Sequence, residues 1–180
     1  MSISSKNLKH GSFAVWMMAA RIPTLPAAIA PVIVGTAMAH YMYSFDVVIT
    51  VLAMFGAIAI QIGANMANDF SDFRKGADNA ERIGPIRVTQ QGLLSEKEIL
   101  AGASISFAIS ILIGLYFFYI VGWPILAIGA LSLLAAVTYT GGPWPFGYKG
   151  LGDLFVFIFF GLIAVCATFY VQVQTINIEI

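Results

Sequence analysis

Four polar side chains recur at helical spacing where a long apolar run ends: Asn65, Asn68, Asp69 and Asp72. Steps of three, four and seven residues place them within an arc of about 100° on one helical face. Carboxylate and amide oxygens suit hard divalent cations. Mg²⁺ takes one or two carboxylates and fills its other positions with water and phosphate oxygens. This face therefore predicts a Mg²⁺ site that also binds a phosphate group.

Two acids at this position require a positively charged partner to offset an energetic cost. If the helix ends near Gly76, Asp69 and Asp72 lie at the negative end of its dipole, which disfavours each carboxylate by about 0.3–1 kcal/mol. Asp78 then falls in the loop beyond. A simpler alternative is that the acids only mark the water interface, but their sharing of one face with two amides favours a bound cation.

Basic residues follow the acids in a long polar loop, among them Lys75, Arg82 and Arg87. Guanidinium groups can grip phosphate with two parallel hydrogen bonds. These residues could instead serve only to fix membrane orientation, which explains their number but not the adjacent acids. Acids that hold a metal beside bases that hold an anion predict a diphosphate site at the membrane surface.

A second polar loop, YTGGPWPFGYKGLGD at 139–153, is rich in glycine, proline and aromatic residues. It lacks the spacing of a P-loop. Its polar side chains either line the same cavity or belong to an ordinary interfacial turn, and both alternatives stay open: Tyr139, Tyr148, Lys149 and Asp153.

Composition places these loops on a membrane protein. The 180 residues are 59% hydrophobic and 10% charged, whereas soluble domains carry about 25% charged residues. Continuous apolar runs favour helices over the alternating strands of a barrel. We therefore expect an all-α polytopic transmembrane helical bundle, a single membrane domain over 1–180 with an active-site loop at 69–98. The expected spans are 22–43, 47–68, 99–121, 123–140 and 153–173.

Charge then sets the orientation. The net charge of zero gives no basic surface for nucleic acid. All nine Lys and Arg residues fall before the first span or in the loops that follow the second and fourth. The positive-inside rule puts this side in the cytoplasm. We expect a multi-pass protein of the cytoplasmic membrane, with its N-terminus inside and its C-terminus, after five spans, outside.

The stretch NMANDFSDFRKGAD resembles the first aspartate motif of the UbiA superfamily of intramembrane aromatic prenyltransferases. Three further stretches are similar to the branch that prenylates 1,4-dihydroxy-2-naphthoate in menaquinone synthesis: ARIPTLPAAIAPVIVGTAMAH, ERIGPIRVTQQGLLS and TYTGGPWPFGYKGLGDLFVFIFFG. The four stretches agree in order over most of the chain.

The resemblance implies transfer of a polyprenyl chain from an allylic polyprenyl diphosphate to 1,4-dihydroxy-2-naphthoate, with loss of CO₂, giving demethylmenaquinone. It implies Mg²⁺ as the cofactor. The implied catalytic and metal-site residues are Asn65, Asp69 and Asp72, supported at the metal by Asn68 and Asp78. The implied diphosphate-binding residues are Lys75, Arg82, Arg87 and Arg21.

The chain departs from the family pattern in one respect. The resemblance implies nine transmembrane helices and a second aspartate motif, but no second D-x-x-x-D follows Asp78. We therefore expect the N-terminal five of the nine helices, as a fragment or one piece of a split enzyme whose C-terminal half is missing. On its own, such a chain is expected to have little or no transferase activity.

Three other functions can be compared with these sequence features. Another membrane prenyltransferase, with a phytyl donor or a different aromatic acceptor, fits the same motifs. A CDP-alcohol phosphotransferase does not, because its D-G-x-x-A-R signature fails where Phe70 follows Asp69 and Phe73 follows Asp72. A cation transporter would usually hold its ion near the bilayer midplane, whereas these acids lie at the end of a span.

Overall fold

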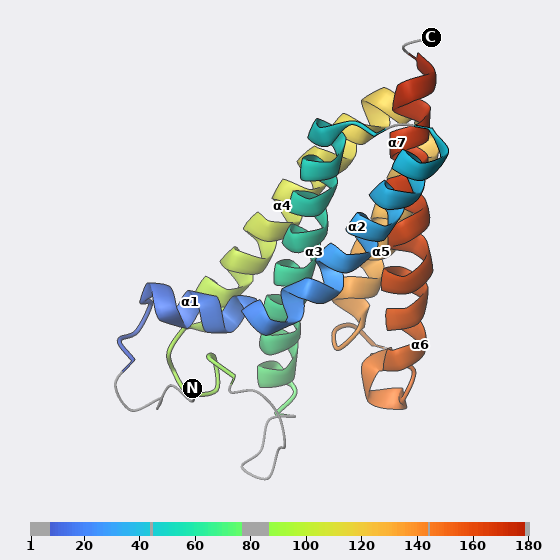
Figure 1. Ribbon diagram of the computed structural model, residues 1–180. Coiled ribbons are helices and arrows are strands. Elements are labelled where there is room, and N and C mark those ends of the chain that lie inside the picture. Colours follow the sequence, from blue (N-terminus) through green and yellow to red (C-terminus); the bar gives the residue numbers. More distant parts are fainter. Residues whose placement is uncertain (1–7, 44, 77–86, 144, 179–180) are drawn as a thin grey trace.

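The computed structural model describes residues 8–43, 45–76, 87–143 and 145–178, and every regular element in these ranges is helical (Figure 1). The all-helical fold class is therefore confirmed. Among the described residues, α5 (Trp123–Thr138) is a shorter apolar helix, and four stretches are long and apolar enough to cross a membrane: Phe13–Met42, Val47–Arg74, Glu96–Val121 and Gly152–Gln174.

The first of these stretches is broken at Arg21. Helix α1 (Phe13–Ala20) ends there because Arg21 has a left-handed backbone, with φ 53°, which is uncommon for a residue other than glycine. One 3₁₀ turn, η2 (Ile22–Thr24), leads into α2 (Leu25–Met42). The prolines of this stretch predict a kinked entry, whereas α1 is a helix that the sequence analysis does not assign.

Helix α3 (Val47–Arg74) carries the predicted polar face and lies at the centre of the bundle, in contact with α1, α2, α4, α5 and α7. It starts at Asp46, whose carboxylate accepts hydrogen bonds from the backbone N–H groups of Val48 and Ile49. It runs six residues beyond the predicted span at 47–68 and stops before Gly76, whose φ of 60° suits a helix end. Asn65 through Asp72 therefore share one continuous helix.

The remaining helices enclose α3. Helix α4 (Glu96–Val121) starts with a capping box between Ser95 and Glu98 and turns at Gly122 into α5. The last stretch begins with η3 (Phe146–Lys149) and α6 (Gly152–Val156). It continues through η4 (Phe157–Ile163), which is a π-helix, into α7 (Ala164–Ile178).

Glycines allow two close helix crossings. A Cβ at Gly63 of α3 would meet the ring of Phe107 in α4 at 2.6 Å. A Cβ at Gly35 of α2 would meet the carbonyl oxygen of Val165 in α7 at 2.6 Å. Small residues of this kind let helices pack closely in membranes. These crossings fix α4 and α7 against the helices that carry the site.

One end of the bundle gathers α1, the C-terminal end of α3, the N-terminal end of α4 and the α5–α6 connection (Figure 1). We call it the charged end, because every Lys and Arg in the described ranges lies in one of these segments, next to one, or in the stretch of chain that leads into α1 or α4. The α2–α3 turn and the end of α7 lie opposite. Which side of the membrane the charged end faces stays a prediction.

Candidate functional site

The predicted polar face is buried at the charged end of α3. Asn65, Asp69 and Asp72 are only 5%, 3% and 3% exposed. Arg74 lies on another face, where it forms an exposed ion pair with Glu96 at 3.0 Å. Burial of two carboxylates on one helix is costly unless charges or hydrogen bonds compensate. The acids thus belong to an internal site rather than to a solvated helix end.

Asp72 is held from two directions. Arg87, which is 5% exposed, forms a buried ion pair with its Oδ2. The hydroxyl of Tyr148 donates a hydrogen bond to its Oδ1. The sequence analysis assigns Arg87 to a diphosphate, whereas the structure brings it to the carboxylate. Tyr148 comes from the second polar loop, so that loop does belong to the site.

Asn65 joins α3 to the break between α1 and α2. Its Nδ2 donates to the carbonyl oxygen of Ala20 and to the hydroxyl of Thr24, each at 2.9 Å. A backbone carbonyl can only accept, so the nitrogen must face Ala20. The amide oxygen is then the group that Asn65 can offer to a ligand.

Asn68 and Lys75 bind the end of α5. The hydroxyl of Thr140 donates to Oδ1 of Asn68 at 2.8 Å. Nζ of Lys75 donates to the carbonyl oxygens of Thr140 at 2.6 Å and Gly142 at 3.4 Å, and lies 5.6 Å from the ring centre of Tyr148. Lys75 therefore braces this loop in the structure. The sequence analysis does not identify Thr140 as a site residue, because a single threonine in an interfacial turn belongs to no recognisable motif.

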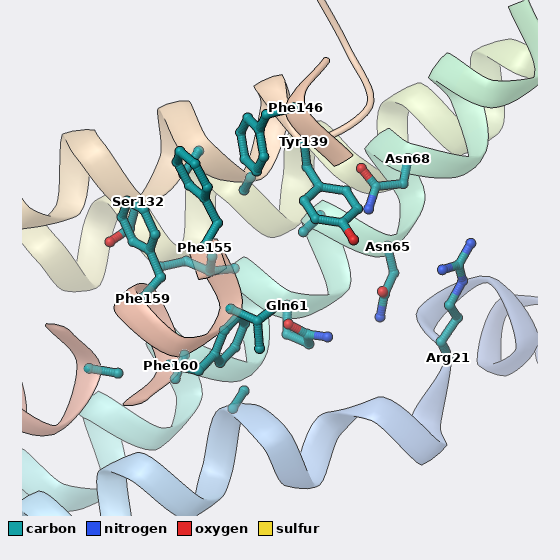
Figure 2. A pocket seen from close by; sticks show the side chains of 18 residues that line it. Arg21, Gln61, Asn65, Asn68, Ser132, Tyr139, Phe146, Phe155, Phe159 and Phe160 are labelled. Atoms are coloured by element: carbon teal, nitrogen blue, oxygen red, sulfur yellow. The ribbon is translucent and has the colours of Figure 1, made fainter. Parts of the chain in front are cut away.

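A cavity of about 300 Å³ opens beside these residues (Figure 2). That volume is at the lower end of the range for small-molecule sites. Arg21, Gln61, Asn65 and Asn68 form one polar side of its lining, and Figure 2 shows aromatic rings on the other. The break at Arg21 places this side chain at the cavity, and its role in binding a diphosphate stays a prediction.

The aromatic wall comes from η3, α6 and η4. Phe146 stacks on Phe155 with ring centres 3.9 Å apart, and Phe155 lies parallel to Phe159 at 6.1 Å. Tyr139 packs edge-on against Phe146. π-Helical turns are rare and often occur at functional sites. Here the wider turn of η4 lets the neighbours Phe159 and Phe160 both line the cavity.

A second, largely apolar cavity of about 160 Å³ lies among α2, α3, α4, α5 and α7. It shares wall residues with the first: Ala57, Ile60, Ser132, Phe159 and Ala164. Phe159 of the aromatic wall therefore lines both cavities.

The donor set suits Mg²⁺. Asp69, Asp72 and the oxygen of Asn65 are hard oxygen ligands on one helical face. Each carboxylate oxygen has two lone pairs, so the bonds from Arg87 and Tyr148 leave Asp72 capacity for a cation. In the described ranges, no group of three or more His, Cys, Asp or Glu side chains is clustered for a metal. Water and a phosphate ligand would have to complete the shell. Asp78 and Arg82 lie outside the described residues.

The chain matches known proteins over nearly its whole length. The UbiA prenyltransferase family model matches residues 28–178. A 1,4-dihydroxy-2-naphthoate octaprenyltransferase of Escherichia coli is 40% identical over 169 residues, and one of Mycobacterium tuberculosis is 40% identical over 166. A 2-carboxy-1,4-naphthoquinone phytyltransferase of Synechocystis is 28% identical over 170 residues.

These alignments cover 89%, 92% and 91% of the chain but only 54%, 56% and 52% of the relatives. The chain thus spans about half the length of the curated relatives it matches. A family match over most of the chain, together with a multi-helical membrane fold and a buried acidic site, identifies it as a multi-pass member of the UbiA prenyltransferase family.

Proposed function

We propose that the chain contributes to transfer of a polyprenyl group from an allylic polyprenyl diphosphate to 1,4-dihydroxy-2-naphthoate. Its similarity to octaprenyltransferases for this acceptor supports the proposal. The single observation that carries it is the two-sided cavity, with Arg21 and the amides of α3 on one side and aromatic rings on the other. The buried acids Asp69 and Asp72 follow Asn65 and Asn68 on the same helix. A diphosphate needs the first surface, and an isoprenoid or aromatic group needs the second.

The polar side of the cavity and the adjacent acids would bind the diphosphate. Asp69, Asp72 and Asn65 would hold Mg²⁺, which supplies positive charge that stabilises the departing diphosphate. Arg21 lines the same cavity and is always charged, so it offers a further phosphate contact. Arg87 would act first on Asp72, since their ion pair holds the carboxylate at the C-terminal end of α3.

The aromatic wall would protect the reacting carbon. When the C–O bond between the prenyl group and the diphosphate breaks, the electron pair leaves with oxygen and an allylic cation remains. Ring faces attract cations, and a wall without water slows capture of the cation by hydrolysis. Tyr139, Phe146 and Phe155 present such rings at the cavity.

The acceptor completes the reaction. The ring carbon that bears the carboxylate donates an electron pair to the cation, forming the new C–C bond. The carboxylate then leaves as CO₂, and the electrons of that bond restore the aromatic ring. The product is the reduced form of demethylmenaquinone. The Synechocystis relative is named a phytyltransferase, so phytyl diphosphate is the alternative donor.

A chimera tests the proposal directly. Residues 1–178 would be joined to the C-terminal part of the Escherichia coli octaprenyltransferase that the chain does not cover, and reconstituted with Mg²⁺ and octaprenyl diphosphate. With carboxyl-labelled 1,4-dihydroxy-2-naphthoate, we expect labelled CO₂ and prenylated product in equal amounts. Phytyl diphosphate, offered in competition, tests the alternative donor.

Two comparisons interpret the result. The same chimera with Asp69→Asn should lose product formation but keep its helical circular dichroism spectrum. The intact Escherichia coli enzyme serves as the positive control. A folded chimera that releases no CO₂ beside an active control would overturn the proposed acceptor, and Mg²⁺ flux without any lipid substrate would favour a transporter instead.

A further inference from the structure

In the structure, the amide of Asn68 lies between Thr140 and the cavity. Its Oδ1 accepts the hydrogen bond from Thr140, and its side chain lines the cavity. Its nitrogen makes no hydrogen bond with any of the described residues. Figure 2 shows this nitrogen on the side of the cavity and the oxygen turned away from it. Asn68 therefore presents a hydrogen-bond donor to the interior.

Thr140 is itself firmly placed. It is 5% exposed, and its carbonyl oxygen accepts a hydrogen bond from Lys75 at 2.6 Å. The next residue, Gly141, has no room for a Cβ, which would lie 2.5 Å from the carbonyl oxygen of Val137 and 3.3 Å from Oγ of Ser71. The hydroxyl of Thr140 thus reaches Asn68 from a fixed backbone.

Asn65 and Asn68 consequently offer opposite groups to one cavity. The nitrogen of Asn65 is bound by Ala20 and Thr24, which leaves its oxygen for a ligand. The oxygen of Asn68 is bound by Thr140, which leaves its nitrogen. An amide oxygen suits a cation, whereas an amide N–H suits an anionic oxygen.

We propose that Asn68 donates a hydrogen bond to an anionic substrate oxygen, and that Thr140 is the positioning residue that aims it. This inference rests on the proposed function and departs from the expectation that Asn68 supports the metal. The oxygen belongs either to the diphosphate of the prenyl donor or to the carboxylate of the aromatic acceptor, which are chemically alike at this position.

Asn68→Asp in the chimera separates the two roles. An aspartate still accepts the hydrogen bond of Thr140 but has no N–H to donate. We expect KM for one substrate to rise by about tenfold or more, the size of a lost hydrogen bond to a charged group, with an unchanged Mg²⁺ midpoint. If Asn68 ligates the metal through oxygen, the carboxylate should instead lower the Mg²⁺ midpoint. That result would overturn the proposal.

Variants of Thr140 test the positioning role. Thr140→Val removes the hydroxyl and should raise the same KM, while Thr140→Ser keeps the hydroxyl and should restore it. Thr138→Val is the matched control, since the hydroxyl of Thr138 donates an exposed hydrogen bond to the helix carbonyl of Leu134 at 2.7 Å. Equal kinetics for Thr140→Val and Thr138→Val would contradict the role of Thr140.

Nuclear magnetic resonance on the full chain in nanodiscs makes the test independent of turnover. With ¹⁵N-labelled asparagine, and Asn68→Ala to assign the signal, the side-chain NH₂ of Asn68 should exchange with water faster than that of Asn65. Thr140→Val should shift the Asn68 signal and Thr138→Val should not. An Asn68 NH₂ that exchanges as slowly as that of Asn65 would overturn the assigned orientation, even if the chimera is inactive.

Two probes then identify the oxygen. Farnesyl thiodiphosphate with Mg²⁺, added alone, should slow exchange of the Asn68 NH₂ if the diphosphate is its partner, and 1,4-dihydroxy-2-naphthoate alone should do so if the acceptor is. If neither probe changes the signal, Asn68 is no substrate donor. A response to the diphosphate in a chimera that makes no product would disprove the proposed transfer and leave the role of Asn68 intact.

Discussion

Arg87 and Asp72 form a buried ion pair that joins the segment before α4 to the C-terminal end of α3. Their side chains are 5% and 4% exposed. Tyr148 bonds the other carboxylate oxygen, so three chain segments meet at one acid. Each of these two buried charges is stabilised by the other. If one is removed, the other stays buried without a counter-charge, because it cannot reach solvent.

Loss of this ion pair should be costly. We expect Arg87→Leu to lower the free energy of unfolding by about 3–5 kcal/mol, because the carboxylate of Asp72 loses its buried partner. Arg74→Leu, which breaks the exposed pair with Glu96, should cost about 1 kcal/mol or less. Denaturant titrations in detergent, followed by circular dichroism, measure both. Similar losses for the two variants would mean that the Asp72–Arg87 pair is not shielded from water.

The two amides of the site should respond differently to the same substitution. Asn65→Asp removes both donated bonds and puts a carboxylate against the carbonyl of Ala20, so we expect a loss of about 1–3 kcal/mol or more. Asn68→Asp keeps the acceptor that Thr140 needs and should leave stability nearly unchanged. Thermal unfolding in one detergent compares them, and the reverse order would show that the amide orientations are wrong.

Gln172 should hold the far end of the bundle together. It is 0% exposed and bonds the backbone N–H and carbonyl of Asp46 and the hydroxyl of Thr50, at 2.9, 3.1 and 2.8 Å. Gln172→Leu should cost about 1–3 kcal/mol by leaving these groups unpaired and should speed hydrogen exchange at the start of α3. Exposed Gln174 supplies the control. If Gln172→Leu and Gln174→Leu have the same stability and the same hydrogen exchange, Gln172 does not hold α7 to the start of α3.

The π turn should set the aromatic wall. Insertion of one alanine after Leu162, which is 51% exposed, would add a residue beyond the one that the π turn absorbs and turn Phe155 and Phe159 by about 100° relative to α7. Since Gly35 fixes α7 against α2, the rings should leave the cavity. We expect binding of farnesyl thiodiphosphate, measured by calorimetry in nanodiscs, to weaken at least about tenfold with little change in helix content. Leu162→Ala keeps the residue count and should bind normally.

The helical membrane fold and the face of α3 that carries Asn65, Asp69 and Asp72 were both predictable from residue types and their spacing. Both are local properties. A run of apolar residues must satisfy its backbone within a helix, and spacing along a helix alone decides which side chains share a face. The family motif is equally local, which explains why the resemblance and the family match agree.

The residues that contact that face were not predictable from the spacing, because they come from distant parts of the chain. Arg87 lies fifteen residues beyond Asp72, and Tyr148 and Thr140 lie more than seventy residues beyond their partners. Spacing cannot predict such contacts, because they depend on how helices cross and on where Arg21 and η4 depart from α-helical geometry. The sequence determined which groups lie on the site helix; packing decided which of their atoms are bound and which face the cavity.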